Sequence, residues 1–223
     1  MVLGLVSLAA SLWDRDGRTQ HGCARLWARL ILAASGVRVA RSGWQISGGP
    51  YVFVANHQSL YDIPILLATL PLQLRILAKE ELFKIPVMGW AMRRSGYVPI
   101  SRRRAAGAVI LRRASELMRA GASVVFFPEG GRNRGRIQPF KAGGFLLAQR
   151  AAVPVVPVTI LGARKILPYG SLRVRAGTVT VVLDPPFSPV QGGRSGADEL
   201  RRRAEELISR RHTQAFPEGE GGG

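Results

Sequence analysis

The stretch YVFVANHQSLYD, residues 51–62, joins a short apolar run directly to a cluster of polar side chains. Its first part, Tyr51–Ala55, has the length and the β-branched and aromatic content of a buried strand. After Asp62 the chain is apolar again and predicts a helix over Ile63–Leu70, with Pro64 in its first turn. A strand that leads into a helix is the repeating unit of an α/β fold.

The same alternation of strand and helix continues along the chain. Strands are predicted at Tyr51–Ala55, Arg75–Ala78, Gly96–Ile100, Ser123–Phe127, Val153–Ile160 and Val179–Leu183. Helices are predicted at Ile63–Leu70, Ile85–Arg94, Ala105–Ala120, Gly143–Ala151 and Ala197–Arg211. We therefore expect an α/β fold, a single domain with a mostly parallel sheet flanked by helices. In such sheets ligands bind beyond the carboxyl ends of the strands.

The bulk composition narrows the class of protein. A chain of 223 residues, 47% of them apolar, fits one domain with a sizeable core. The formal net charge of +18 favours an anionic partner, which means nucleic acid, an anionic membrane surface or a phosphorylated substrate. The single cysteine, Cys23, excludes an internal disulfide and indicates a reducing compartment.

Two apolar stretches lie near the N-terminus. The first, Met1–Trp13, contains no charge and lacks the positive start of a secretory signal. The second, Leu30–Val37, follows a basic segment around Arg25 and Arg29. Neither stretch reaches the roughly 20 apolar residues of a membrane-spanning helix. Trp27 and Leu30 alternate with Arg25 and Arg29, a composition typical of a helix that lies in the membrane interface. An amphipathic helix packed on the domain is the alternative.

These observations divide the chain into three segments. Residues 1–34 are expected to form an N-terminal membrane-associating helical arm, and residues 35–212 the α/β domain. Residues 213–223 are rich in glycine and glutamate and are expected to be disordered.

His57 is the only one of the three histidines with a carboxylate five residues later, at Asp62. A histidine acts as a general base when an acceptor such as a carboxylate holds its other ring nitrogen. The alternative is that Asp62 caps the helix that begins at Ile63, and both roles can coexist.

A second polar cluster, FFPEGGRNR at residues 126–134, follows the predicted strand Ser123–Phe127. Its glycines let backbone amides approach an anion, and its arginines supply forked donors matched to phosphate. A plain surface turn would leave the position of Glu129, close to the strand end, unexplained. Arg102, in a run of three arginines after the strand Gly96–Ile100, stands where a phosphate ligand is expected.

Together these segments resemble the glycerolipid acyltransferases, the family of 1-acylglycerol-3-phosphate acyltransferases. Five features occur in the family's order between about residues 35 and 185. They are His57 with Asp62, the stretch Lys79–Trp90, Phe127-Pro128-Glu129-Gly130 with Arg132, its continuation Pro139–Gly143, and Val153–Val158 with Pro157.

The resemblance implies acyl transfer from a thioester to a glycerol hydroxyl. It assigns His57 as the base and Asp62 as the group that orients it. Glu129 would hold the glycerol portion of the acceptor, and Gly130 would give it room. The resemblance also implies a phosphate site at Arg102, Arg132 and Lys79, and a substrate-binding role for Pro157.

Two positions depart from the family pattern. Many members have Asp-Arg at the end of the second motif, where this chain has Ser101-Arg102, and Glu-Gly-Thr-Arg in the third, where Gly131 replaces the threonine. Both positions flank the expected phosphate site, so another lysolipid, such as a lyso-ornithine lipid or a lysophospholipid, is an alternative acceptor.

The expected partners are an anionic membrane surface, a lysophospholipid acceptor and acyl-CoA or an acyl carrier protein as co-substrate. No cofactor or metal is expected, because one cysteine and three dispersed histidines form no ligand set. The arginines lack the interleaved aromatics of a nucleic-acid binder. An inactive membrane scaffold would not need the His57–Asp62 pair. We expect a peripheral or monotopic protein on the cytoplasmic face of the cell membrane.

Overall fold

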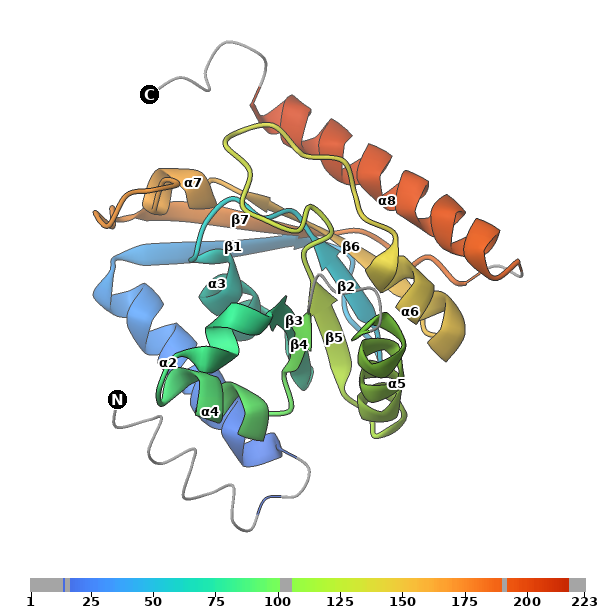
Figure 1. Cartoon of the computed structure of the whole chain (residues 1–223). Helices are drawn as coiled ribbons and strands as arrows, with labels where there is room; N and C mark the ends of the chain where they lie inside the picture. The colour runs from blue at the N-terminus through green and yellow to red at the C-terminus, as the bar shows by residue number, and fades with distance from the viewer. Residues whose placement is uncertain (1–13, 15–16, 101–105, 190–191, 217–223) are drawn as a thin grey trace.

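A computed structural model of the chain describes residues 14, 17–100, 106–189 and 192–216. One seven-stranded sheet, in the order β1-β7-β6-β2-β5-β3-β4, carries helices on both faces (Figure 1). The strands are β1 (Val37–Gly43), β2 (Val52–Ala55), β3 (Leu74–Lys79), β4 (Val98–Ile100), β5 (Ser123–Phe126), β6 (Val155–Leu161) and β7 (Gly177–Leu183). The helices are α2 (Arg18–Ala34), α3 (Asp62–Thr69), the 3₁₀ helix η1 (Glu80–Lys84), α4 (Met88–Arg94), α5 (Ala106–Arg119), α6 (Gly143–Ala151), α7 (Ala163–Ile166) and α8 (Arg194–Ala215).

The predicted mostly parallel sheet is confirmed. All neighbouring strands are parallel except β6 and β7. A parallel pair needs a crossover connection that returns the chain to the opposite edge of the sheet. The segment between β6 and β7 contains only the four-residue helix α7 and makes no such crossover. Consequently β7 and its parallel neighbour β1 run against the other five strands.

Strand β2 lies in the middle of the sheet, and all four of its residues are buried. Phe53 and Ala55 belong to the core that α2 and α3 cover, whereas Val52 and Val54 belong to the core beneath α5, α6 and α8. Two-sided burial explains why β2 is a continuous apolar run rather than an alternating one. Because β2 is the central strand, the residues that follow Ala55 lie at the middle of the sheet edge formed by the strand ends.

Strand β1 and helix α7 were not predicted. Along β1, the valines Val37 and Val39 pack toward the core while Arg38 and Ala40 are exposed. This alternation suits an edge strand with one wet face, but the two arginines within VRVARSG mask it in the sequence. The predicted helix Ile85–Arg94 is confirmed over α4, which begins only at Met88, and the 3₁₀ helix η1 precedes the predicted range.

Residues 18–34 do not form an arm separate from the domain. Helix α2 packs on α3, and Ala28 and Leu32 are buried in the same core as the sheet. The opposite side of α2 exposes its larger apolar side chains: Leu26 is 48% exposed, Trp27 41% and Leu30 54%. Residues 1–13, including Trp13, lie outside the described residues.

The predicted start of a disordered tail at residue 213 is wrong, because α8 continues to Ala215. Arg211, in its last turns, donates from Nε to Oδ2 of the buried Asp184 at 2.7 Å, which fixes the helix to the end of β7. Residues 217–223 lie outside the described residues. None of the described helices combines the length and the apolar character that crossing a membrane requires.

Asn56 fastens the end of β2 to β6. Its fully buried amide donates to the Ile160 carbonyl at 2.9 Å and accepts from the Ile160 N–H at 2.7 Å. A side chain thus completes a backbone ladder between two segments 104 residues apart.

Replacing Asn56 with alanine should lower the free energy of unfolding by about 2–4 kcal/mol, because it leaves two buried backbone groups unpaired. Urea unfolding of the purified chain measures this. Gln45→Ala, which removes an exposed amide, is the control and should change stability by less than about 0.5 kcal/mol. Equal stabilities for both variants would contradict the assigned role.

Candidate active site

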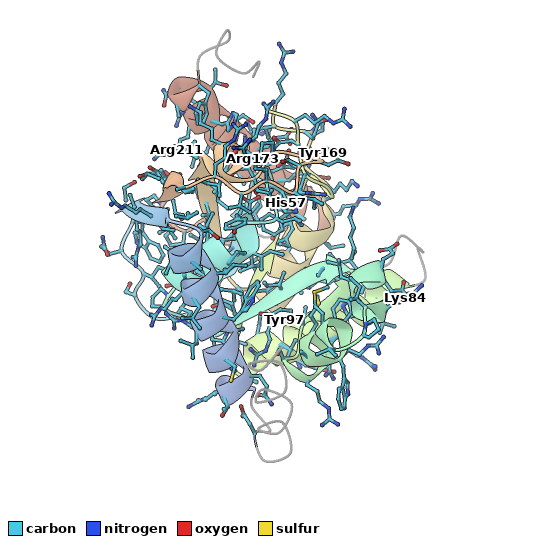
Figure 2. The ribbon with its side chains drawn as sticks, turned by 90° about the vertical axis from the view of Figure 1, so that its left-hand side faces the viewer. His57, Lys84, Tyr97, Tyr169, Arg173 and Arg211 are labelled. Atoms are coloured by element: carbon cyan, nitrogen blue, oxygen red, sulfur yellow. The ribbon has the colours of Figure 1, made fainter. Side chains whose placement is uncertain are left out.

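The catalytic candidates gather at one edge of the sheet. Strands β2, β5, β3 and β4 are mutually parallel, so their carboxyl ends lie together. His57 follows β2, Glu129 follows β5, and Lys79 is the last residue of β3. Figure 2 shows His57 beneath the loop that carries Tyr169 and Arg173. The edge predicted from the sequence to bind a ligand is therefore the edge at which these residues meet.

His57 and Asp62 form the predicted pair. Nδ1 of His57 donates to Oδ2 of Asp62 at 2.8 Å. The imidazole is 15% exposed, and the carboxylate is fully buried. A buried carboxylate on Nδ1 fixes the imidazole orientation and its tautomer, and it directs Nε2 outward.

The carboxylate of Asp62 does not cap α3. Its Oδ2 also accepts from the backbone N–H groups of Gln58 and Ser59, at 2.7 and 2.8 Å, and α3 has no side-chain cap. Asp62 therefore turns back and organises the loop that presents His57. Its Oδ1 is buried and has no hydrogen-bond partner within the part of the chain that the structure describes.

The ring of His57 stacks on Phe127, with centroids 4.1 Å apart and planes 20° from parallel. Phe127 directly follows β5, so the adjacent strand supplies one wall for the imidazole. Among the described residues, none hydrogen-bonds to Nε2 of His57. The arrangement is thus a histidine oriented at one nitrogen and free at the other to accept a proton.

Glu129 is buried, and protein donors occupy its carboxylate. Oε1 accepts from the His57 N–H at 2.7 Å and from the Asn133 amide at 3.0 Å. Oε2 accepts from the Asn133 amide and from the Gln138 N–H, both at 2.8 Å. Burial raises the pKa of the Glu129 carboxyl above its ordinary value, and these hydrogen bonds partly oppose that shift.

The assignment of Glu129 to the glycerol portion of the acceptor conflicts with this geometry. A carboxylate offers about four acceptor sites, and here three donor groups, the His57 N–H, the Asn133 amide and the Gln138 N–H, make four contacts with them. Binding a glycerol hydroxyl would require Glu129 to give up a buried partner. The geometry instead makes Glu129 a positioning residue for the loop that carries His57.

Asn133 completes this clamp and was not singled out from the sequence. Its N–H donates to the His57 carbonyl at 2.6 Å, while its side chain holds both oxygens of Glu129. Both backbone groups of His57 are therefore bound by the loop after β5. An asparagine four residues after Glu129 is a weak signal, because only the fold brings that loop against His57.

The C-terminal helix also reaches the catalytic loop. The amide of Gln58 contacts Nε2 of the buried His212 at 2.6 Å. Burial lowers the pKa of His212, which favours the neutral imidazole that can accept this hydrogen bond. Helix α8, the last helix of the domain, thus contacts the residue next to His57.

Arg132 is half-buried and lies over the Tyr169 ring, with Cζ 4.7 Å from the centroid; Arg134 lies 4.9 Å from the same centroid and is exposed. Gly130 has φ +73°, and a Cβ there would meet Nζ of Lys141 at 2.4 Å, so this turn requires glycine. At Gly131 a Cβ would meet open space, so the local packing does not exclude the family's threonine.

The structure describes two of the three remaining predicted ligands. Lys79 is exposed and in register with Ile100, the last residue of β4. Arg102 lies outside the described residues. Pro157 is buried within β6, opposite Val54, and its carbonyl accepts from the Asp184 N–H at 3.0 Å. This buried position inside the sheet does not favour the predicted direct contact of Pro157 with substrate. Pro157 instead packs beside β2, the strand that leads to His57.

The chain is thus a mostly parallel α/β domain with a His–Asp pair at the carboxyl edge of its sheet. The Acyltransferase family pattern matches residues 36–161, more than half of the chain. The chain belongs to the acyltransferase family.

Named relatives support this assignment. The chain is 39% identical over 210 residues to the chloroplastic 1-acyl-sn-glycerol-3-phosphate acyltransferase BAT2 of Brassica napus, covering 89% of this chain and 59% of that protein. It is 38% identical to the chloroplastic LPAT1 of Arabidopsis thaliana, with 85% and 53% covered. This chain thus spans little more than half the length of these curated relatives. The crystal structure of the 1-acyl-sn-glycerophosphate acyltransferase PlsC from Thermotoga maritima has a TM-score of 0.76 at 29% identity, covering 95% of this chain and 87% of that one.

Replacing Asn133 with alanine should increase hydrogen exchange at the His57 amide and lower the turnover of acyl transfer by about tenfold or more, since a small displacement of a catalytic group is costly. The KM for the acceptor should change little, because the Asn133 amide is engaged with Glu129 inside the protein. Arg134→Ala, one residue further along the loop, is the control for local disruption. A raised acceptor KM with unchanged turnover would show that this loop binds substrate rather than positioning His57.

Proposed function

We propose that the chain transfers an acyl group from a thioester to the sn-2 hydroxyl of 1-acylglycerol-3-phosphate, which yields phosphatidic acid and a free thiol. The observation that supports this most strongly is the His57–Asp62 contact at 2.8 Å, which engages Nδ1 and leaves Nε2 of His57 without a hydrogen-bond partner among the described residues. The similar proteins are 1-acyl-sn-glycerol-3-phosphate acyltransferases, and they supply the acceptor class of the proposal.

In the proposed reaction, Nε2 of His57 takes the proton of the acceptor hydroxyl as its oxygen attacks the thioester carbonyl. The new C–O ester bond forms, the C–S bond breaks, and the thiolate leaves with the proton returned from the imidazolium. Asp62 stabilises the imidazolium and keeps Nδ1 protonated. No covalent acyl-enzyme is required, because the acceptor is itself the nucleophile.

The acceptor phosphate is proposed to bind Arg132 and Arg102, with Lys79 assisting. Arg132 is half-buried and held against Tyr169, which limits the conformational freedom that its guanidinium would lose on binding. A guanidinium binds phosphate through two parallel hydrogen bonds. Gly130, with its positive φ, turns the chain between Glu129 and this arginine.

The donor is proposed to be acyl-CoA or an acylated carrier protein. The membrane contact is proposed to involve the exposed face of α2, where Leu26, Trp27 and Leu30 are each between 41% and 54% exposed. Such a face, in a chain with net charge +18, suits a peripheral protein on an anionic cytoplasmic leaflet.

His57→Ala should reduce transfer from an acyl thioester to lysophosphatidic acid by roughly 10²–10⁴-fold, the usual contribution of a general base. Asp62→Asn should lose most of the activity too, because the amide cannot stabilise the imidazolium. Thiol release by the purified chain measures both rates, and circular dichroism controls for folding. Retention of more than a few per cent of the rate in His57→Ala would rule out the mechanism.

Arg132→Lys should raise the KM for the phosphorylated acceptor and leave the thioester KM nearly unchanged, because lysine keeps the charge but not the two-pronged geometry. Arg134→Lys is the matched control, since Arg134 lies over the same tyrosine but is exposed. Steady-state kinetics with each substrate varied in turn distinguishes the two. If Arg132→Lys affected acceptors with and without a phosphate equally, the phosphate assignment would fail, and a lysolipid without a terminal phosphate would become the acceptor.

A further inference from the structure

The loop between α7 and β7, residues 168–176, displays apolar side chains to solvent. Leu172 is 97% exposed, Tyr169 46% and Val174 39%. Single exposed apolar residues are common on soluble proteins. Here, however, three occur within six residues and alternate with the exposed Arg173 and Arg175.

Hydrogen bonds hold the loop in this shape. The Ser171 N–H donates to the Pro168 carbonyl at 3.2 Å, and the Arg173 N–H donates to Oγ of Ser171 at 3.0 Å. At the base, the Arg175 N–H donates to the Ile166 carbonyl at 2.8 Å. These bonds bracket Leu172 at the tip, so its exposure is a property of the turn.

The loop and helix α2 are both tied to the segment between His57 and Asp62. Oγ of Ser59 donates to the Leu167 carbonyl at 2.9 Å, directly before the loop. From the other side, the Ser35 hydroxyl at the end of α2 bonds the Tyr61 hydroxyl at 2.5 Å. Both elements lie on the left of the molecule in Figure 1, and in Figure 2, turned to face that side, the loop with Tyr169 and Arg173 passes above α2.

The segment of sequence that contains the loop carries charges of one sign. No aspartate or glutamate occurs between Glu129 and Asp184. The basic residues of that span are Arg132, Arg134, Arg136, Lys141, Arg150, Arg164, Lys165, Arg173 and Arg175. A basic surface with apolar side chains at its tip is complementary to the head groups and acyl boundary of an anionic leaflet.

We propose that residues 168–176 form a second membrane contact, in which Leu172 and Val174 enter an anionic lipid surface while Arg173 and Arg175 bind its head groups. The inference rests on the proposed function in one respect, namely that the substrates are lipids. With α2 and the loop both at the surface, the catalytic loop between them would face the leaflet that holds the acceptor. The loop would thereby set the approach of His57 to the membrane.

The test uses the full chain with its single cysteine replaced (Cys23→Ser) and a solvent-sensitive fluorophore on Leu172→Cys, Leu30→Cys or Val109→Cys. Val109 is the matched control, 59% exposed but on α5 across the sheet. With vesicles of phosphatidylglycerol and phosphatidylcholine, the emission at positions 172 and 30 should shift to the blue, and that at 109 should not.

Unlabelled variants measure the contribution of the loop. Leu172→Asp should weaken vesicle binding about tenfold or more, and Arg173→Gln or Arg175→Gln should each weaken it roughly fivefold on anionic vesicles only. Val109→Asp should have no effect. Each variant should keep the wild-type rate with a monomeric, water-soluble short-chain acceptor, because the loop does not touch the reacting atoms.

An unshifted label at position 172 on anionic vesicles would overturn the proposal, whether or not position 30 responds. A shift that required an acidic carrier protein and not vesicles would also overturn it and would make the loop a protein-docking surface. If the wild-type chain transferred no acyl group while position 172 still inserted, the proposed function would fail and the membrane contact would stand.

Discussion

The site depends on hydrogen-bond donors for two buried carboxylates, those of Asp62 and Glu129. An ionised carboxylate buried without partners costs several kcal/mol, so the groups around Asp62 and Glu129 are constrained to supply donors. Asp62 obtains them from the His57 ring and two backbone N–H groups of the same loop, and Glu129 obtains them from the His57 backbone, Asn133 and Gln138. His57 is the residue they share. One carboxylate fixes its ring and the other its backbone, so satisfying the buried charge and positioning the base are the same requirement.

The parallel sheet makes this convergence possible. His57 and Glu129 are 72 residues apart, yet β2 and β5 are hydrogen-bonded neighbours with their carboxyl ends at the same edge. Asn56 adds a further connection, because its amide pairs with Ile160 of β6 immediately before the catalytic loop begins. The strand before the base is thereby held on both sides, by β5 and by β6, and the loop starts from a fixed point.

The packing of helix α2 on the core changes how the proposed membrane attachment relates to catalysis. A separate arm would tether the domain loosely, but α2 is part of the core and touches the catalytic loop through Ser35 and Tyr61. A membrane surface bound through α2 would therefore have a fixed orientation relative to His57. The loop of residues 168–176 is also linked to the catalytic loop, through the hydrogen bond between Ser59 and Leu167, so its orientation relative to His57 is fixed as well.

The sequence alone determined the alternation of strands and helices and the mostly parallel character of the sheet, and it made His57 and Asp62 the candidate pair, because each depends on apolar periodicity or on residues close together in the chain. Tertiary structure decided the rest. Glu129 resembles a substrate ligand until the fold brings the His57 N–H, Asn133 and Gln138 to its oxygens. Strand β1 is recognisable only as the neighbour of β7, and α2 joins the core only because α3 offers an apolar face. Local patterns specify which side chains are available, whereas contacts between distant segments decide which of them remain free to bind a substrate.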